Sequence, residues 1–178
     1  DDPLIHKQDP GNRRFTVWMA IALIVVVADQ VTKRAVIEFI ELYGRVPLMD
    51  FINLTHQRNT GAAFSFLADA GGWQRWFFVV LATLVSGMLT VWLWRVRYEA
   101  PLILAAGLSL VLGGAVGNLI DRFVYGYVTD FIQVWLGDWA FPSFNVADSA
   151  ITVGAALLIV DSLFFSGRTK KGTETDQA

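Results

Sequence analysis

Acidic residues in an otherwise apolar part of the chain are the first candidates for chemistry. Four acids lie between residues 121 and 148: Asp121, Asp130, Asp138 and Asp148. Asp130 stands in the apolar and aromatic segment 128–131, where a carboxylate has no evident role in solubility. Two carboxylates that share one proton can hydrolyse a peptide bond without serine, cysteine or metal, because one accepts a proton from water while the other donates to the substrate. Four acids allow six pairs, and we select Asp130 and Asp148 as the candidate pair.

Other polar residues gather near the ends of apolar segments. Asn118 and Arg122 are four residues apart and share one face of a helix. Asn145 and Asp148 are three residues apart and share a face likewise if the next helix begins that early. Asp29 lies near the end of an earlier apolar segment. Antiparallel packing of the two later helices would bring their polar faces together at one depth.

Two of these acids also have purely structural interpretations. Asp121 and Arg122 can form an ion pair that only marks where a helix leaves lipid. Asp148 can serve as the N-cap of its helix, because aspartate is a preferred capping residue. An arginine near several carboxylates can instead hold one of them ionised or orient a loop.

Composition excludes several other chemistries. The 178 residues include no cysteine, which removes disulfides, thiolate zinc sites and a cysteine nucleophile. Two histidines, His6 and His56, leave little material for a zinc site or a Ser-His-Asp relay. A net charge of −2 argues against a nucleic-acid partner, which would require a cationic surface. We expect neither a metal nor a cofactor.

The composition of the chain, with 54% hydrophobic and only 17% charged residues, indicates an integral membrane protein. Segments 76–94 and 101–120 carry no charge and are long enough to cross a bilayer as helices. Segments of about 15–35 and 149–165 reach that length with one or a few charges. We therefore predict one integral domain over 15–165, between polar tails at 1–14 and 166–178. Small residues at Gly113, Gly117 and Gly154 predict close helix packing.

Basic residues predict the orientation of the spans. They flank the first span, fill the short link between the second and third, and follow the fourth: Arg13, Arg14, Arg95, Arg97, Arg168, Lys170 and Lys171. Basic residues favour the cytoplasmic side, so both termini are predicted to be cytoplasmic. The first span also fits a cleaved signal peptide, because two arginines precede an apolar run of 14 residues.

The two long connectors, 36–75 and 121–148, then lie outside the cytoplasm. Short β-branched and aromatic pieces at 46–48 and 51–54 are typical of strands. Segments 131–135 and 139–141, joined through Gly137 and Asp138, predict a hairpin. The predicted fold is a bundle of four transmembrane helices with a small extracytoplasmic β platform.

Five motifs, in this order, resemble the lipoprotein signal peptidases, also called signal peptidase II. They are Asp29-Gln30-Val31-Thr32-Lys33, Asn59-Thr60-Gly61-Ala62-Ala63-Phe64, Gly117-Asn118-Leu119-Ile120-Asp121-Arg122, Val128-Thr129-Asp130-Phe131 and Phe144-Asn145-Val146-Ala147-Asp148. Each motif alone is weakly specific, but five in order over residues 29–160 are highly specific. The resemblance retains the first span as a membrane helix, which argues against the cleaved signal peptide.

The resemblance implies an aspartic endopeptidase of the bacterial inner membrane with an extracytoplasmic β cradle. Its substrate would be a prolipoprotein with diacylglycerol on the lipobox cysteine, cut just before that cysteine near the outer face of the membrane. The implied catalytic residues are Asp130 and Asp148, which agrees with the pair selected above. The implied supporting residues are Asp29, Asn59, Gly61, Asn118, Arg122 and Asn145. Membrane lipid and a globomycin-class inhibitor are the further implied partners.

Three other functions compete with this interpretation. Intramembrane acids and an arginine also suit a proton-coupled transporter, although the inner halves of the second and third spans are almost wholly apolar. An assembly subunit that uses only the small-residue face would tolerate substitution of Asp130 and Asp148. A Ser-Lys peptidase would use Lys33 and Ser149.

Overall fold

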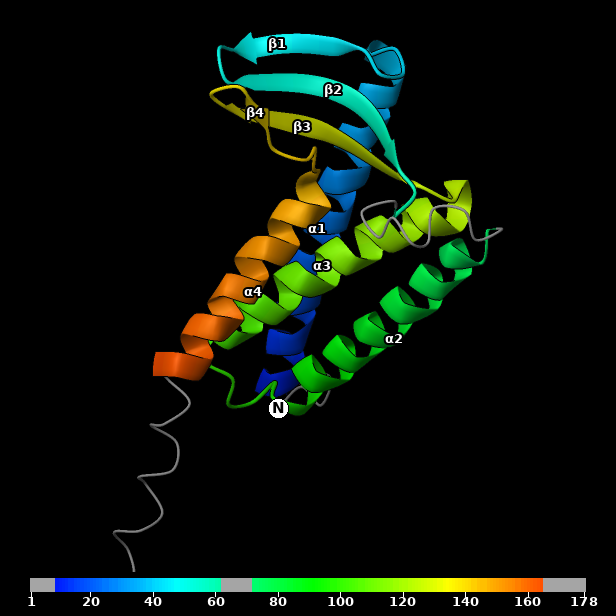
Figure 1. Ribbon diagram of the computed structural model, residues 1–178. Coiled ribbons are helices and arrows are strands. Elements are labelled where there is room, and N and C mark those ends of the chain that lie inside the picture. The colour runs from blue at the N-terminus through cyan, green and yellow to red at the C-terminus, as the bar shows by residue number, and fades with distance from the viewer. Residues whose placement is uncertain (1–8, 62–71, 165–178) are drawn as a thin grey trace, which may run out of the picture.

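The computed structural model describes residues 9–61 and 72–164. Four long helices form a bundle, and a four-stranded sheet lies at the end of the bundle opposite the start of α1 (Figure 1). The elements in chain order are α1 (Pro10–Phe39), β1 (Arg45–Met49), β2 (Ile52–Asn59), α2 (Trp73–Arg95), α3 (Leu102–Tyr125), β3 (Val128–Leu136), β4 (Trp139–Ala140) and α4 (Val146–Phe164). The predicted four-helix fold with a β platform is confirmed. Residues 1–8 and 166–178 of the predicted tails, residue 165 of the predicted domain and residues 62–71 of the first connector lie outside the described residues.

All four helices are long and apolar enough to cross a membrane. They extend beyond the predicted spans because a helix continues past its apolar run wherever its ends find hydrogen-bond partners. At the start of α1, the Asp9 carboxylate accepts the Gly11 N–H at 2.9 Å, and Pro10 occupies the first turn. Helix α3 passes Ile120 and ends at Tyr125, where it is capped by Gly126, whose φ of +81° suits glycine.

Helix α3 packs against each of the other three helices. The α3–α4 contact depends on glycine, because a Cβ at Gly114 would lie 2.4 Å from the backbone oxygen of Ala147. A Cβ at Gly154 would lie 2.8 Å from the Gly107 oxygen. The close approach predicted from the small residues is confirmed, and it brings the start of α4 against the polar part of α3.

The sheet is antiparallel throughout, with the order β1-β2-β3-β4. Both predicted strands of the first connector and the predicted hairpin of the second are present. Pro47 lies in β1, an edge strand, where the missing N–H costs no ladder bond. Strand β3 is interior and pairs Asp130 with Gln57 of β2, after a register shift between Leu54 and Gln57. Asp130 is thereby fixed on a paired strand at the end of the bundle.

Replacing Gly114 by alanine should destabilise the bundle. The new methyl group meets backbone rather than a flexible side chain, so α4 must shift, at a cost of about 1–3 kcal/mol. Gly87→Ala in α2 is the matched control, because its Cβ would meet nothing within 4 Å. Thermal unfolding in detergent should show a lower Tm for Gly114→Ala only. Equal Tm values for the two variants would contradict this packing.

Candidate active site

The structure brings Asp130 and Asp148 into hydrogen-bond contact with one residue, Asn145. The side-chain amide of Asn145 donates to Asp130 Oδ1 at 2.8 Å. Its backbone N–H donates to Asp148 Oδ2 at 3.2 Å. Asn145 is fully buried, Asp130 is buried, and Asp148 is half-buried. The two selected acids therefore belong to one hydrogen-bonded site, in which β3 supplies Asp130 and α4 supplies Asp148.

The start of α4 determines how Asp148 is held. Asn145 precedes the helix, and its side-chain oxygen accepts the Asp148 N–H at 2.8 Å, while Asp148 accepts the Asn145 N–H in return. This reciprocal pair is a capping box. The interpretation of Asp148 as the N-cap is therefore wrong, because Asn145 is the cap. The first turn of a helix also favours a negative charge through the helix dipole.

The pKa of Asp130 is raised from 3.8 to about 6, chiefly because burial disfavours its charged form. The hydrogen bond from Asn59 Nδ2 to Asp130 Oδ2, at 3.0 Å, acts in the opposite direction and lowers this pKa. The charge of Asp148 raises the pKa further, whereas Asn145 and Lys33 lower it. An acid with a pKa of about 6 can exist in either protonation state near neutral pH, as proton transfer requires.

Asn59 is oriented toward Asp130 by the turn that follows β2. The Gly61 N–H donates to Asn59 Oδ1 at 2.9 Å, so the amide nitrogen of Asn59 points toward Asp130. Gly61 has a φ of +91°, and a Cβ there would lie 2.7 Å from the Phe78 ring. Gly61 therefore supports the site through Asn59.

Asn118 and Arg122 lie on α3 beside Asp148. Asn118 Nδ2 donates to Asp148 Oδ1 at 2.8 Å. The guanidinium of Arg122 lies over the Phe78 ring, 5.2 Å from its centroid, and attracts Asp148 and Asp130 electrostatically. Among the described residues it makes no ion pair within 4 Å. Arg122 therefore contributes positive charge at longer range.

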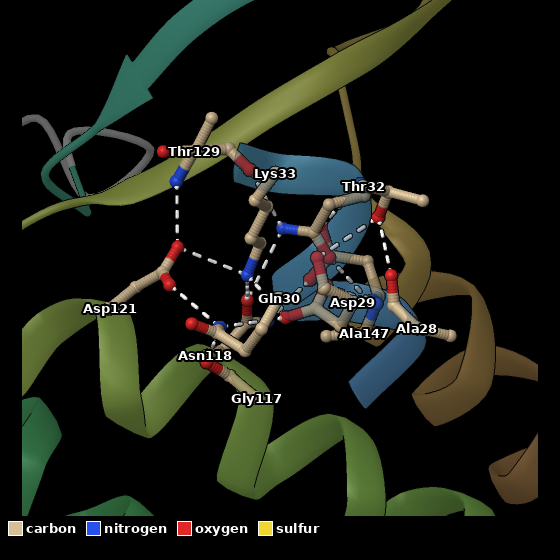
Figure 2. Close-up of polar contacts among 12 residues, drawn as sticks. Ala28, Asp29, Gln30, Thr32, Lys33, Gly117, Asn118, Asp121, Thr129 and Ala147 are labelled. Atoms are coloured by element: carbon tan, nitrogen blue, oxygen red, sulfur yellow. Dashed lines mark hydrogen bonds and ion pairs between the residues drawn. The ribbon is translucent and has the colours of Figure 1, made fainter. Parts of the chain in front are cut away.

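A buried charge cluster lies beside these residues, and the sequence interpretation missed it. Lys33 Nζ is 2.7 Å from Asp29 Oδ2 and 3.0 Å from Asp121 Oδ2, and all three side chains are almost completely buried (Figure 2). Asp121 thus pairs with Lys33, and the interpretation of Asp121 and Arg122 as an interfacial pair is wrong. The sequence contained one sign of this cluster, because Asp29 and Lys33 are four residues apart and therefore adjacent on one face of a helix.

Asp29 and Asp121 each also accept a backbone N–H from another element. Asp29 Oδ1 accepts the N–H of Ala147, in the first turn of α4, at 2.9 Å. Asp121 Oδ2 accepts the N–H of Thr129, at the start of β3, at 3.0 Å. Gln30, which was not among the predicted site residues, donates to Asp121 Oδ1 at 2.9 Å. Because α1 supplies Asp29 and Lys33 to this cluster, its packing favours an integral helix over a cleaved signal peptide.

The contacts of the described residues bear on two other chemistries, a Ser-Lys pair and a metal site. A Ser-Lys pair needs its amine bonded to the serine hydroxyl, whereas Lys33 binds three other oxygens and Ser149 Oγ donates to the Asn145 carbonyl oxygen at 3.0 Å. Across residues 9–61 and 72–164, no group of three or more His, Cys, Asp or Glu could hold a metal ion.

An apolar groove of about 500 Å³ reaches Asp148 from outside the bundle. Its walls come from the segment before α4 and from the outer face of α4 itself: Phe141, Pro142, Phe144, Thr152 and Val153. A chain segment or acyl chain lying in this groove would pass directly beside the Asp148 carboxylate.

Four apolar helices of membrane-spanning length, with two aspartates at one end that both accept hydrogen bonds from one asparagine, define a multi-pass membrane protein with a carboxylate-pair site. Residues 21–164 match the family model described as signal peptidase (SPase) II. The chain is 47% identical over 172 residues to a lipoprotein signal peptidase of Shewanella oneidensis, covering 97% of this chain and 98% of the relative. It is 52% identical over 158 residues to one of Cupriavidus pinatubonensis, covering 89% of each.

A solved structure is also similar. A bacterial membrane enzyme determined by the in meso method at 1.9 Å resolution superposes with a TM-score of 0.74 and 32% identity, covering 85% of this chain and 95% of that one. The chain belongs to the lipoprotein signal peptidase family, the signal peptidase II group of aspartic peptidases. This assignment sets aside the transporter and the assembly subunit.

Removing the Asn59 amide should shift the pH dependence of peptidase activity. The Asn59 bond stabilises the ionised form of Asp130, so Asn59→Ala raises the pKa of Asp130 above its value of about 6. The limb of the kcat/KM profile with an apparent pKa near 6 should therefore move to higher pH, whichever role Asp130 has. Asn53→Ala, in the same strand but paired with Gln133, is the control and should leave the limb in place. An unmoved limb in Asn59→Ala would show that Asp130 does not govern it.

Proposed function

We propose that this membrane peptidase removes the signal peptide from prolipoproteins whose lipobox cysteine carries diacylglycerol, cutting just before that cysteine. Asp130 and Asp148 are the proposed catalytic residues. The observation that carries the proposal is that Asn145 donates a hydrogen bond to one oxygen of each aspartate, which holds both carboxylates beside one residue. The sequence motifs and the family assignment support the same pair.

The proposed reaction uses the pair as one proton-sharing unit. The ionised carboxylate takes a proton from water as the water oxygen bonds to the scissile carbonyl carbon. The protonated carboxyl stabilises the carbonyl oxygen, and a proton then passes to the amine as the C–N bond breaks. Burial and the Asp148 charge, which raise the pKa of Asp130 to about 6, support a single shared proton near neutral pH.

The distribution of arginines supports a topology with both termini in the cytoplasm and the site near the outer face. Arg14 donates to the backbone oxygens of Tyr98 and Ala100, both at 2.6 Å, so the start of α1 adjoins the α2–α3 link. These basic segments lie at the end of the bundle opposite the sheet (Figure 1). Under the positive-inside rule that end is cytoplasmic, and residues 15–165 form one integral domain of the bacterial inner membrane.

The apolar groove beside Asp148 supports a lipid-bearing substrate. A signal peptide is itself a membrane helix, and a diacylglyceryl group beside its scissile bond remains in the acyl region of the bilayer. A site at the membrane interface meets this bond without extracting the lipid. A globomycin-class inhibitor is proposed to compete for the same site.

Cleavage of a diacylglyceryl prolipoprotein and its unlipidated twin by the detergent-purified protein tests this function. The lipidated substrate should be cut just before the modified cysteine, at least about 100-fold faster, because binding only a few CH₂ groups at about 0.8 kcal/mol each supplies that preference. Mass spectrometry of both products locates the cut. Equal rates for the twins, or a cut elsewhere, would contradict the proposal.

A further inference from the structure

Lys33 touches neither aspartate of the proposed pair, yet it is 2% exposed and fully bonded. Its ammonium group has three N–H donors, and three oxygens receive them: Asp29 Oδ2, Asp121 Oδ2 and Asn118 Oδ1, the last at 3.0 Å. Figure 2 shows Lys33 extending from α1 toward Asn118 and Asp121 of α3. The bond to Asn118 connects the buried charge cluster to the proposed site.

The chemistry of an amide makes this bond directional. Asn118 presents an oxygen that only accepts and a nitrogen that only donates. Lys33 can only donate, so it requires the Asn118 oxygen, and the nitrogen is left for Asp148 Oδ1 at 2.8 Å. Asn145 Nδ2 donates to the same Asn118 oxygen at 3.2 Å and favours the same orientation.

Without Lys33 the opposite orientation would gain partners. The carboxylates of Asp29 and Asp121 would lack their cation and would attract the Asn118 nitrogen. The Asn118 oxygen would then face the Asp148 carboxylate, and two acceptors repel. The hydrogen bond that holds Asp148 would be lost without any change at Asp148 itself.

We propose that Lys33 is a positioning residue that fixes the amide orientation of Asn118 and thereby the placement of Asp148. This inference rests on the proposed catalytic role of Asp148. Asp29 and Asp121 hold the ammonium group and also bind the N–H groups of Ala147 and Thr129. The ammonium position is therefore set against α4 and β3, the two elements that carry Asp148 and Asp130.

A variant series made in an Asp121→Asn background tests the inference. Lys33→Met alone would leave two buried carboxylates without a cation and can fail to fold, whereas Lys33→Met with Asp121→Asn removes one charge of each sign. The series comprises Asp121→Asn, then the same chain with Lys33→Met, with Asn118→Ala, and with both. Steady-state cleavage of a diacylglyceryl prolipoprotein gives kcat and KM for each, and thermal unfolding in detergent reports folding.

Adding Lys33→Met should lower kcat about 100-fold, the order of loss that a misplacement of about 1 Å causes, and change KM less than about threefold. Adding Lys33→Met to the chain that already has Asn118→Ala should leave kcat almost unchanged, because Lys33 acts through Asn118. A purely structural role would lower the Tm and leave kcat of the folded fraction intact.

Two results would overturn the inference: Lys33→Met could leave kcat unchanged, or the kcat losses caused by Lys33→Met and by Asn118→Ala could multiply. If Asp121→Asn does not fold or does not cleave, Asp29→Asn provides the second background with the same expected outcomes. Failure of the unchanged chain to cleave the prolipoprotein would overturn the proposed function itself, which keeps the two failures distinguishable.

Discussion

The fold of the site depends on one buried interaction, a lysine ammonium group held between two carboxylates inside the helix bundle. Charges there are costly unless they are paired, so Lys33, Asp29 and Asp121 require one another. Two of these residues come from α1 and one from α3, which fixes the two helices against each other. Asp29 Oδ1 and Asp121 Oδ2 also accept the N–H groups of Ala147 and Thr129, at the starts of α4 and β3. One charge cluster thereby sets the positions of four elements.

The side chains that donate hydrogen bonds to Asp130 and Asp148 are asparagines, and there is a physical reason for this residue type. An aspartate pair needs neighbours that donate hydrogen bonds without adding charge, and an amide also accepts a bond that sets its orientation. Asn59 is oriented by Gly61, Asn118 by Lys33, and Asn145 by its cap on α4. The two aspartates consequently have different surroundings, with Asp130 buried on a strand and Asp148 in the first turn of a helix.

The sequence predicted features that depend on neighbouring residues, but it did not predict contacts between residues far apart in the chain. Uncharged runs predicted the helices, β-branched pieces predicted the strands, and small residues predicted the α3–α4 contact. The selection of Asp130 and Asp148 came from an acid in an apolar segment and from the resemblance. The roles of Lys33 and Asn145 could not be predicted, because the bond from Lys33 to Asn118 spans 85 residues and the cap of α4 depends on where the helix begins. The Lys33 cluster had only the spacing from Asp29 as a local sign.

Substitution of the aspartates one at a time tests the central claim most directly. Asp130→Asn, Asp148→Asn and the control Asp138→Asn, at an exposed turn of the same connector, are compared for cleavage of a diacylglyceryl prolipoprotein and for thermal unfolding. The account predicts that each of the first two lowers the rate at least about a thousandfold while the protein stays folded, because each removes one of the two proton-transfer groups. Asp138→Asn should cleave at the unchanged rate. A folded Asp130→Asn or Asp148→Asn protein that cleaves at the rate of the control would contradict it.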